Sequence, residues 1–242
     1  MKYKILIFDL DDTLIDNTEN TKSAFETMLA ACGEKFSDAE FSRWYEIDRQ
    51  FWIDWQDDLI EIPKNLKHET GKKSDEFLDW VRSQRVLRYF DDSISAERAI
   101  ELNNIYMQSL NDTVVPIEGV RDTLEYLSEK YKIVIATNGP NVATQKKLEK
   151  IDSLQFVAEV LSADMFGFMK PRIEFFKAIE ERYSNFSLND YLIIGDSLKS
   201  DVGFGMNAGI DSCWFNANND VVADGYSPTY TIQHLTELKS LL

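Results

Sequence analysis

Short apolar runs and amphipathic stretches alternate along the second half of the chain. Each apolar run has the length of a strand, and most are followed by a stretch whose apolar residues recur at helical spacing. Strands that alternate with helices predict a parallel sheet covered by helices on both faces. The predicted strands comprise residues 5–8, 132–136, 156–161, 191–194, 212–215 and 230–232, and the predicted helices residues 120–127, one ending near residue 151, 173–183, 198–208 and one from Leu235.

Residues 16–112 follow a different pattern, because no convincing strand interrupts them. Glu40 follows Ser37 at the spacing of a capping box, which is typical of the start of a helix. We therefore expect an all-helical insert of residues 16–112 within an α/β core made of residues 1–15 and 113–242. The predicted helices of this region comprise residues 14–31, a helix from Ser37, residues from about 74 to 89, and a helix after Ser95.

The composition narrows the class of partner. The chain of 242 residues carries a formal net charge of −16, which argues against duplex DNA or RNA and against an anionic membrane surface. A small anionic substrate stays open, because a bound metal ion inverts the local field. Cys32 and Cys213 form no Cys-x-x-Cys motif, and no run approaches the roughly 18 apolar residues of a membrane-spanning helix. We expect a reduced cytoplasmic protein.

Polar and acidic residues follow the ends of several predicted strands. The carboxyl ends of parallel strands meet at one edge of a sheet, where such folds bind their ligands. We therefore expect residues that are far apart in the sequence to converge on one cleft. These residues are Asp9 and Asp11 after the first strand, Thr137 and Asn138 after the strand at 132–136, Asp196 after Gly195, and Lys170 just beyond the strand predicted at 156–161.

The acidic residues of this cleft predict a metal site. Asp9, Asp11, Asp196 and Asp201 would bring up to four carboxylates together. Two like charges about 5 Å apart repel by roughly 3 kcal/mol at an effective dielectric constant of about 20, so a phosphate dianion would not enter unaided. Oxygen ligands of this kind suit Mg²⁺, which is held by one or two carboxylates together with phosphate oxygens and water.

The remaining polar residues suit a phosphate group. Lys170 adds a positive charge, while Thr137, Asn138 and nearby backbone N–H groups can donate hydrogen bonds to phosphate oxygens. Within such a site, Asp9 can act as a nucleophile and Asp11 as a general acid.

Four motifs connect the chain with a known family. Asp9-Leu10-Asp11-Asp12-Thr13 resembles the D-x-D-x-T signature of the haloacid dehalogenase-like (HAD) hydrolase superfamily, and Thr137-Asn138 and Lys170-Pro171 resemble its second and third motifs. The segment from Gly195-Asp196-Ser197 to Asp201 resembles the fourth. All four occur in order at strand ends, and the match spans the whole chain. The resemblance implies a Rossmann-like doubly wound core whose insert is a helical cap.

The resemblance also implies roles for the acidic residues. Asp9 would attack phosphorus and form an aspartyl-phosphate, and Asp11 would protonate the leaving oxygen and then activate water. Mg²⁺ would be held by the Asp9 carboxylate, the Asp11 backbone carbonyl and Asp196. Asp201 would stabilise the metal site without binding the metal directly. The dehalogenase branch usually lacks an acid at the position of Asp11, so its presence favours phosphoryl chemistry over carbon–halogen chemistry.

The same resemblance assigns the phosphate contacts and a substrate class. Thr137 and Lys170 would hold the phosphoryl group, with Asn138 beside them. In overall likeness, although not in a diagnostic motif, the chain is similar to bacterial pyrimidine 5'-nucleotidases, so the expected partner is a small phosphorylated metabolite such as a nucleotide. A sugar-phosphate phosphatase, a phosphomutase and a phosphoacceptor signalling domain without turnover stay open, as does the oligomeric state.

The insert carries an aromatic stripe at helical spacing, which consists of Phe41, Trp44, Tyr45, Phe51, Trp52 and Trp55. Its position predicts the core of the cap rather than a wall for stacking bases. Which cap residues select the substrate is not decided by the sequence. The candidates are Trp44, Trp52, Trp55 and Arg85.

Overall fold

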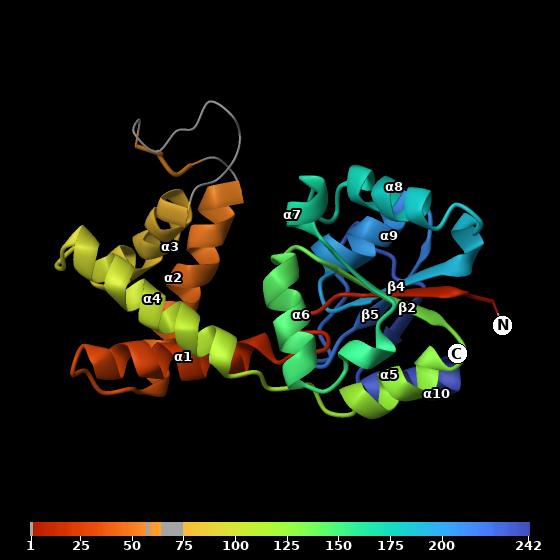
Figure 1. Ribbon diagram of the computed structural model, residues 1–242, viewed down its shortest axis with the longest axis horizontal. Coiled ribbons are helices and arrows are strands. Elements are labelled where there is room, and N and C mark those ends of the chain that lie inside the picture. Colours follow the sequence, from red (N-terminus) through yellow and green to blue (C-terminus); the bar gives the residue numbers. More distant parts are fainter. Residues whose placement is uncertain (1, 57–58, 64–74) are drawn as a thin grey trace. The chain divides into compact units, whose positions relative to one another are not determined.

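The structure of the chain is a computed structural model that describes residues 2–56, 59–63 and 75–242. The chain divides into two compact units. The first consists of Met1–Thr18 and Val114–Leu242, and the second of Glu19–Thr113. Figure 1 follows the chain through both units from red to blue. None of the described helices is long and apolar enough to span a membrane.

Within the described residues, the first unit is built on a six-stranded sheet in the order β3-β2-β1-β4-β5-β6, with every pair parallel. β1 lies between β2 and β4, so the strand order reverses beside it, and parallel sheets bind ligands at such a point. The predicted doubly wound fold is confirmed. The strands are β1 (Ile5–Phe8), β2 (Lys132–Thr137), β3 (Glu159–Ser162), β4 (Tyr191–Gly195), β5 (Asp211–Phe215) and β6 (Tyr230–Ile232).

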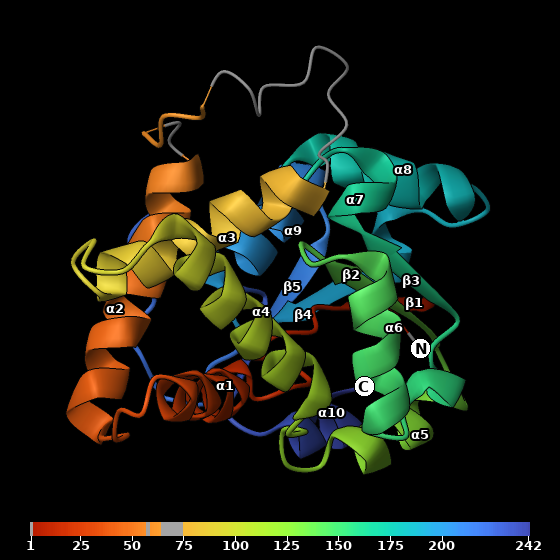
Figure 2. The same cartoon turned by 60° about the vertical axis from the view of Figure 1, so that its left-hand side comes forward.

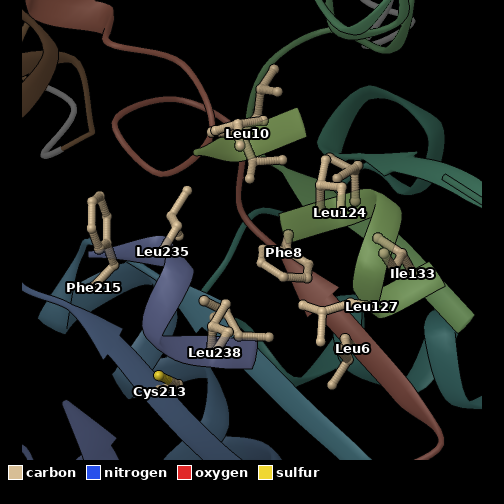
Figure 3. Close-up of a cluster of buried hydrophobic side chains, with 14 of the residues drawn as sticks. Leu6, Phe8, Leu10, Leu124, Leu127, Ile133, Cys213, Phe215, Leu235 and Leu238 are labelled. Carbon is tan, nitrogen blue, oxygen red and sulfur yellow. The ribbon is translucent and has the colours of Figure 1, made fainter. Parts of the chain in front are cut away.

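The residues of β1 show why both faces of the sheet are covered. Leu6 and Phe8 belong to one hydrophobic cluster (Figure 3), and Ile5 and Ile7 belong to another on the opposite face. Burying each side chain contributes about 1.5–3 kcal/mol, so apolar residues on both sides require two layers of helices. The first face is covered by α5 (Val120–Ser128), α6 (Asn141–Lys150) and α10 (Leu238–Leu241), and the second by α8 (Ile173–Arg182) and α9 (Gly203–Ala208) (Figure 1).

The described residues of the second unit form helices and no strand (Figure 2). Two of the helices begin at serine caps, as hydroxyl oxygens satisfy free N–H groups there. Ser37 Oγ accepts from the Glu40 N–H, and Ser95 Oγ accepts from the Arg98 N–H, both at 3.2 Å. The helices are α1 (Asn17–Ala31), α2 (Asp38–Gln56), α3 (Asp75–Tyr89) and α4 (Ala96–Asp112).

The aromatic stripe of α2 contributes to the interior of this second unit. Trp44 is fully buried. The guanidinium of Arg85 lies 5.6 Å from the Trp44 ring and 5.7 Å from the Trp52 ring, and it pairs with Asp48 at 2.6 Å. A buried guanidinium requires such partners, so Arg85 is a structural centre of the unit. The side chain of Trp55 lies outside the described residues.

Two sequence predictions near the third strand need correction. The strand predicted at 156–161 begins at Glu159, because Leu154–Phe156 forms a 3₁₀ turn whose apolar side chains pack on the first face of the sheet. A short helix that was not predicted, α7 (Ala163–Phe166), follows β3. Lys170 therefore lies beyond a helical turn and not directly after a strand.

Two helices next to the site also differ from the prediction. α1 starts at Asn17 and not near residue 14, because Leu14 and Ile15 are buried in the cluster of the first face. The helix predicted over 198–208 is divided into a π-helical turn, Leu198–Val202, and α9. Further 3₁₀ turns lie at Leu188–Asp190 and Leu235–Glu237.

Candidate active site

The end of β1 carries Asp9 into a cavity. Its N–H donates to the carbonyl oxygen of Ile194 in β4 (2.9 Å), so the sheet still holds its backbone. The chain then turns at Asp12, whose φ of 62° is a left-handed conformation that aspartate tolerates. Asp12 Oδ1 accepts from the Asn17 N–H at 3.0 Å, which ties the loop to the start of α1. Asp12 therefore shapes the loop that presents Asp9 and Asp11.

Asp196 is held by two residues to which the sequence assigned no role. Thr13 is fully buried, and its Oγ1 donates to Asp196 Oδ1 (3.2 Å) and accepts from the Asp196 N–H (3.0 Å). The indole N–H of Trp214 donates to the Asp196 carbonyl oxygen at 2.6 Å. The threonine of the first motif thus fixes the aspartate of the fourth. The D-x-D-x-T pattern could have indicated Thr13, whereas Trp214 lies on β5 outside any motif.

Gly195 allows Asp201 to fold back against the end of β4. A Cβ atom at Gly195 would lie 2.2 Å from Asp201 Cγ, so no side chain fits at this position. Asp201 is 1% exposed, and its Oδ2 accepts from the Ser197 N–H at 3.0 Å. The glycine of the fourth motif is thus required by the packing of the motif's own last residue.

Lys170 forms ion pairs with two of the acids in the cavity. Its Nζ lies 2.6 Å from Asp9 Oδ1 and 2.7 Å from Asp201 Oδ1, and its side chain is 1% exposed. The side-chain amide of Asn138 makes two hydrogen bonds to the backbone of Lys170. Asn138 Oδ1 accepts from the Lys170 N–H (2.8 Å), and Asn138 Nδ2 donates to the Lys170 carbonyl oxygen (3.2 Å). The Asn138 amide therefore positions Lys170, and the predicted phosphate contact of Asn138 would fall to its backbone N–H.

All the site residues predicted from the sequence line one cavity of about 220 Å³ at the carboxyl edge of the sheet. Thr137, at the end of β2, accepts from the Gly139 N–H at 3.0 Å, and its hydroxyl hydrogen can be donated to a ligand. The residues lining the cavity are Asp9, Asp11, Thr137, Asn138, Gly139, Lys170, Asp196, Ser197, Ser200 and Asp201.

Lys147 on α6 is a site contact that sequence reasoning missed. Its Nζ lies 2.6 Å from Asp11 Oδ1, and its side chain is 12% exposed. The sequence offers Lys146, Lys147 and Lys150 in this helix without distinguishing among them. Lys147 is the lysine that contacts Asp11 because its position on α6 faces the site.

The profile of the haloacid dehalogenase-like hydrolase family matches residues 3–209. The chain belongs to this family. The four motifs, the parallel sheet and the shared cavity agree with this assignment, so the family predicted from the motifs is confirmed.

Two curated relatives and one solved structure match this HAD-like hydrolase over its full length. The chain is 26% identical to pyrimidine 5'-nucleotidase YjjG of Escherichia coli (100% of this chain, 99% of the relative). It is 27% identical to pyrimidine 5'-nucleotidase PynA of Streptococcus pneumoniae (100% and 96%). The crystal structure of the HAD-hydrolase YfnB from Bacillus subtilis bound to magnesium superposes with a TM-score of 0.84 at 26% identity (100% and 99%).

Acidic groups outnumber basic groups in the carboxylate cluster of this HAD-like site. Carboxylate oxygens of Asp9, Asp196 and Asp201 lie within 4.8 Å of one another. Burial raises the pKa of Asp9 to about 7 against the opposing charge of Lys170, with neighbouring carboxylates adding to the rise. Burial, followed by the neighbouring carboxylates, raises the pKa of Asp196 to about 8. Although burial opposes its charge, Asp201 and Asp9 raise the pKa of Lys170 above its usual value. One lysine thus faces three clustered carboxylates, an arrangement that suits a divalent cation.

Proposed function

We propose that this HAD-like phosphatase is a Mg²⁺-dependent phosphomonoesterase that acts on nucleoside 5'-monophosphates through an aspartyl-phosphate. The observation that carries the proposal is the cavity that brings Asp9, Asp11 and Lys170 together with the carboxylates of Asp196 and Asp201. The nucleotide class is supported by full-length similarity to two pyrimidine 5'-nucleotidases. The helical unit Glu19–Thr113, predicted as residues 16–112, would be the cap domain.

The first half of the reaction uses both acids of the first motif. Asp9 Oδ1 accepts from Lys170, which leaves Oδ2 to attack phosphorus. As the new Asp9 oxygen–phosphorus bond forms, the bond to the leaving oxygen breaks, and Asp11 transfers its proton to that oxygen. In the second half, Asp11 takes a proton from water, the water oxygen bonds to phosphorus, and cleavage of the aspartyl-phosphate restores Asp9 and releases inorganic phosphate.

The carboxylates of Asp9 and Asp196, with the backbone carbonyl of Asp11, would hold Mg²⁺. The clustered oxygens fit a small cation with oxygen ligands. Asp201 would stabilise the site without binding the ion directly, because its Oδ1 accepts from Lys170 and its Oδ2 accepts from the Ser197 N–H. When bound, Mg²⁺ would neutralise negative charge on the carboxylates and the phosphoryl oxygens.

Three donors of the chain would bind the phosphoryl group. The ammonium group of Lys170 lies beside Asp9, at the point where the phosphorus must approach. Thr137 ends β2, Asn138 follows it, and both residues line the same cavity, so the Thr137 hydroxyl and the Asn138 backbone N–H would be the other two donors. Because these groups are held rigidly by the sheet edge, they would stabilise developing charge with little reorganisation.

Removing the metal is expected to make stability fall as pH rises. Burial and neighbouring carboxylates raise the pKa of Asp9 and Asp196 to about 7 and about 8, so the metal-free folded protein holds protons that the unfolded chain releases near pH 4. Its stability should therefore decrease between about pH 4 and about pH 8. Mg²⁺ replaces these protons, so thermal unfolding should show a larger rise in Tm on adding Mg²⁺ at pH 8 than at pH 5.5. In the variant Asp196→Asn the Mg²⁺ effect should shrink. An equal Tm rise at both pH values would contradict the assignment of this site.

A panel of phosphomonoesters tests the function directly. We expect Mg²⁺-dependent release of inorganic phosphate, with kcat/KM for pyrimidine nucleoside 5'-monophosphates at least about tenfold above that for sugar phosphates, or about 1.4 kcal/mol in transition-state binding. Higher kcat/KM for sugar phosphates would reject the nucleotide assignment, and transfer of phosphate within a sugar would indicate a phosphomutase. A stable phosphoprotein without turnover would indicate a phosphoacceptor domain instead.

A further inference from the structure

The two lysines at the site pair with different acids. Lys170 contacts Asp9 and Asp201, whereas Lys147 contacts Asp11 at 2.6 Å. Lys147 comes from α6, which covers the first face of the sheet, and Asp11 comes from the loop after β1. The carboxylate of Asp11 is 35% exposed, so it would sample several rotamers without a fixed partner.

The two carboxylate oxygens of Asp11 have different surroundings. Oδ1 accepts from Lys147 Nζ. Oδ2 lies on the side of Gly139, since a Cβ atom at Gly139 would be 3.8 Å from it and 3.3 Å from Thr137 Oγ1. An ammonium group only donates hydrogen bonds, so Oδ1 is occupied as an acceptor and Oδ2 is the oxygen that can carry a transferable proton. Oδ2 is thus on the side of the β2 edge, where the phosphoryl group would bind.

We propose that Lys147 is a positioning residue that fixes the Asp11 carboxyl group for proton transfer. The inference rests on the proposed phosphomonoesterase activity. Lys147 contacts Asp11 and is not among the described residues that line the cavity, so we place its effect on Asp11 and not on the phosphoryl group. Its ion pair holds the Asp11 rotamer in which Oδ2 donates a proton to the leaving oxygen and later accepts one from water.

The variant Lys147→Met tests this role through the leaving group. With a nucleoside 5'-monophosphate, kcat should fall about 10- to 100-fold while KM changes less than about threefold, because proton transfer typically contributes about 10²- to 10⁴-fold. With 4-nitrophenyl phosphate, whose leaving group needs no proton, the first-turnover burst of nitrophenolate should keep its wild-type rate, followed by slow turnover. Lys147→Arg should restore part of kcat. Lys146→Met, which removes an exposed lysine from the same helix, should behave as the wild type.

A double-mutant cycle separates positioning from an independent effect. If Lys147 acts through Asp11, adding Lys147→Met to Asp11→Asn should cost less than about twofold in kcat. The proposal would be overturned if the kcat losses of the two single variants multiply in the double variant. It would also be overturned if Lys147→Met has wild-type kcat on nucleotides. Thermal unfolding of each variant identifies any loss that comes from misfolding, in which case Lys147→Gln is measured in its place. Absence of turnover in the wild type would instead reject the proposed function.

Discussion

Replacing Asp9 with Asn should abolish turnover while the protein stays folded. The amide has nearly the shape of the carboxylate and can still accept from Lys170, but it is not a nucleophile and forms no aspartyl-phosphate. We expect kcat/KM for phosphate release to fall by about 10⁴-fold or more, which corresponds to about 5.5 kcal/mol of transition-state stabilisation. Steady-state phosphate release and acid-quench trapping of the phosphoprotein measure the two consequences.

The control for Asp9→Asn is Asp122→Asn. Asp122 is an exposed acid in the first turn of α5, away from the cavity, so its loss removes the same charge without touching the site. This variant should keep wild-type kcat/KM. Activity of Asp9→Asn within tenfold of the wild type would show that Asp9 is not the nucleophile, whatever the substrate.

Replacing Lys170 with Met should damage both stability and activity. The lysine side chain is 1% exposed and pairs with Asp9 and Asp201, so its loss leaves buried carboxylates without their cation. Breaking such a pair costs about 3–5 kcal/mol, which in a chain of this size lowers Tm by about 10 °C. Because Lys170 is the proposed charged donor to the phosphoryl group, its loss should also reduce kcat by about 10²-fold or more. Thermal unfolding with EDTA and steady-state kinetics with Mg²⁺ measure the two effects.

Two further variants distinguish the effect of the buried position of Lys170 from the effect of its charge. Lys177→Met removes an exposed lysine of α8 and should leave Tm and kcat unchanged. Lys170→Arg keeps the charge, but the larger planar guanidinium does not fit a buried slot shaped for an ammonium group, so it should not restore activity. A Lys170→Met variant as stable as the wild type in EDTA would show that the carboxylates do not depend on this ion pair.

The strand ends were predictable because local chemistry and topology point to the same edge. A short apolar run followed at once by carboxylates, as in Ile5–Phe8 and Asp9, fits a buried strand that ends at a ligand site. Once several such runs alternate with helices, the sheet must be parallel, and its carboxyl ends must meet. The separate positions of Asp9, Thr137 and Asp196 were therefore brought together correctly from the sequence.

Other features depend on the direction of side chains and could not be predicted in this way. Lys147 and Lys146 are adjacent lysines of one helix, and only the rotation of α6 about its axis turns Lys147 towards Asp11. The strand predicted at 156–161 was misplaced, because its first apolar residues gain as much from packing as a 3₁₀ turn as from joining a sheet.

The sequence by itself determined the family, the parallel sheet and the residues that meet at its edge, because motif order and hydrophobic periodicity are local properties of the chain. Only the tertiary structure decided how these residues divide their contacts. Lys170 pairs with Asp9 and Asp201, Lys147 pairs with Asp11, and Asn138 holds the backbone of Lys170. Such pairings depend on distances of 2.6–2.8 Å between side chains from different elements, and sequence spacing carries no information at that scale.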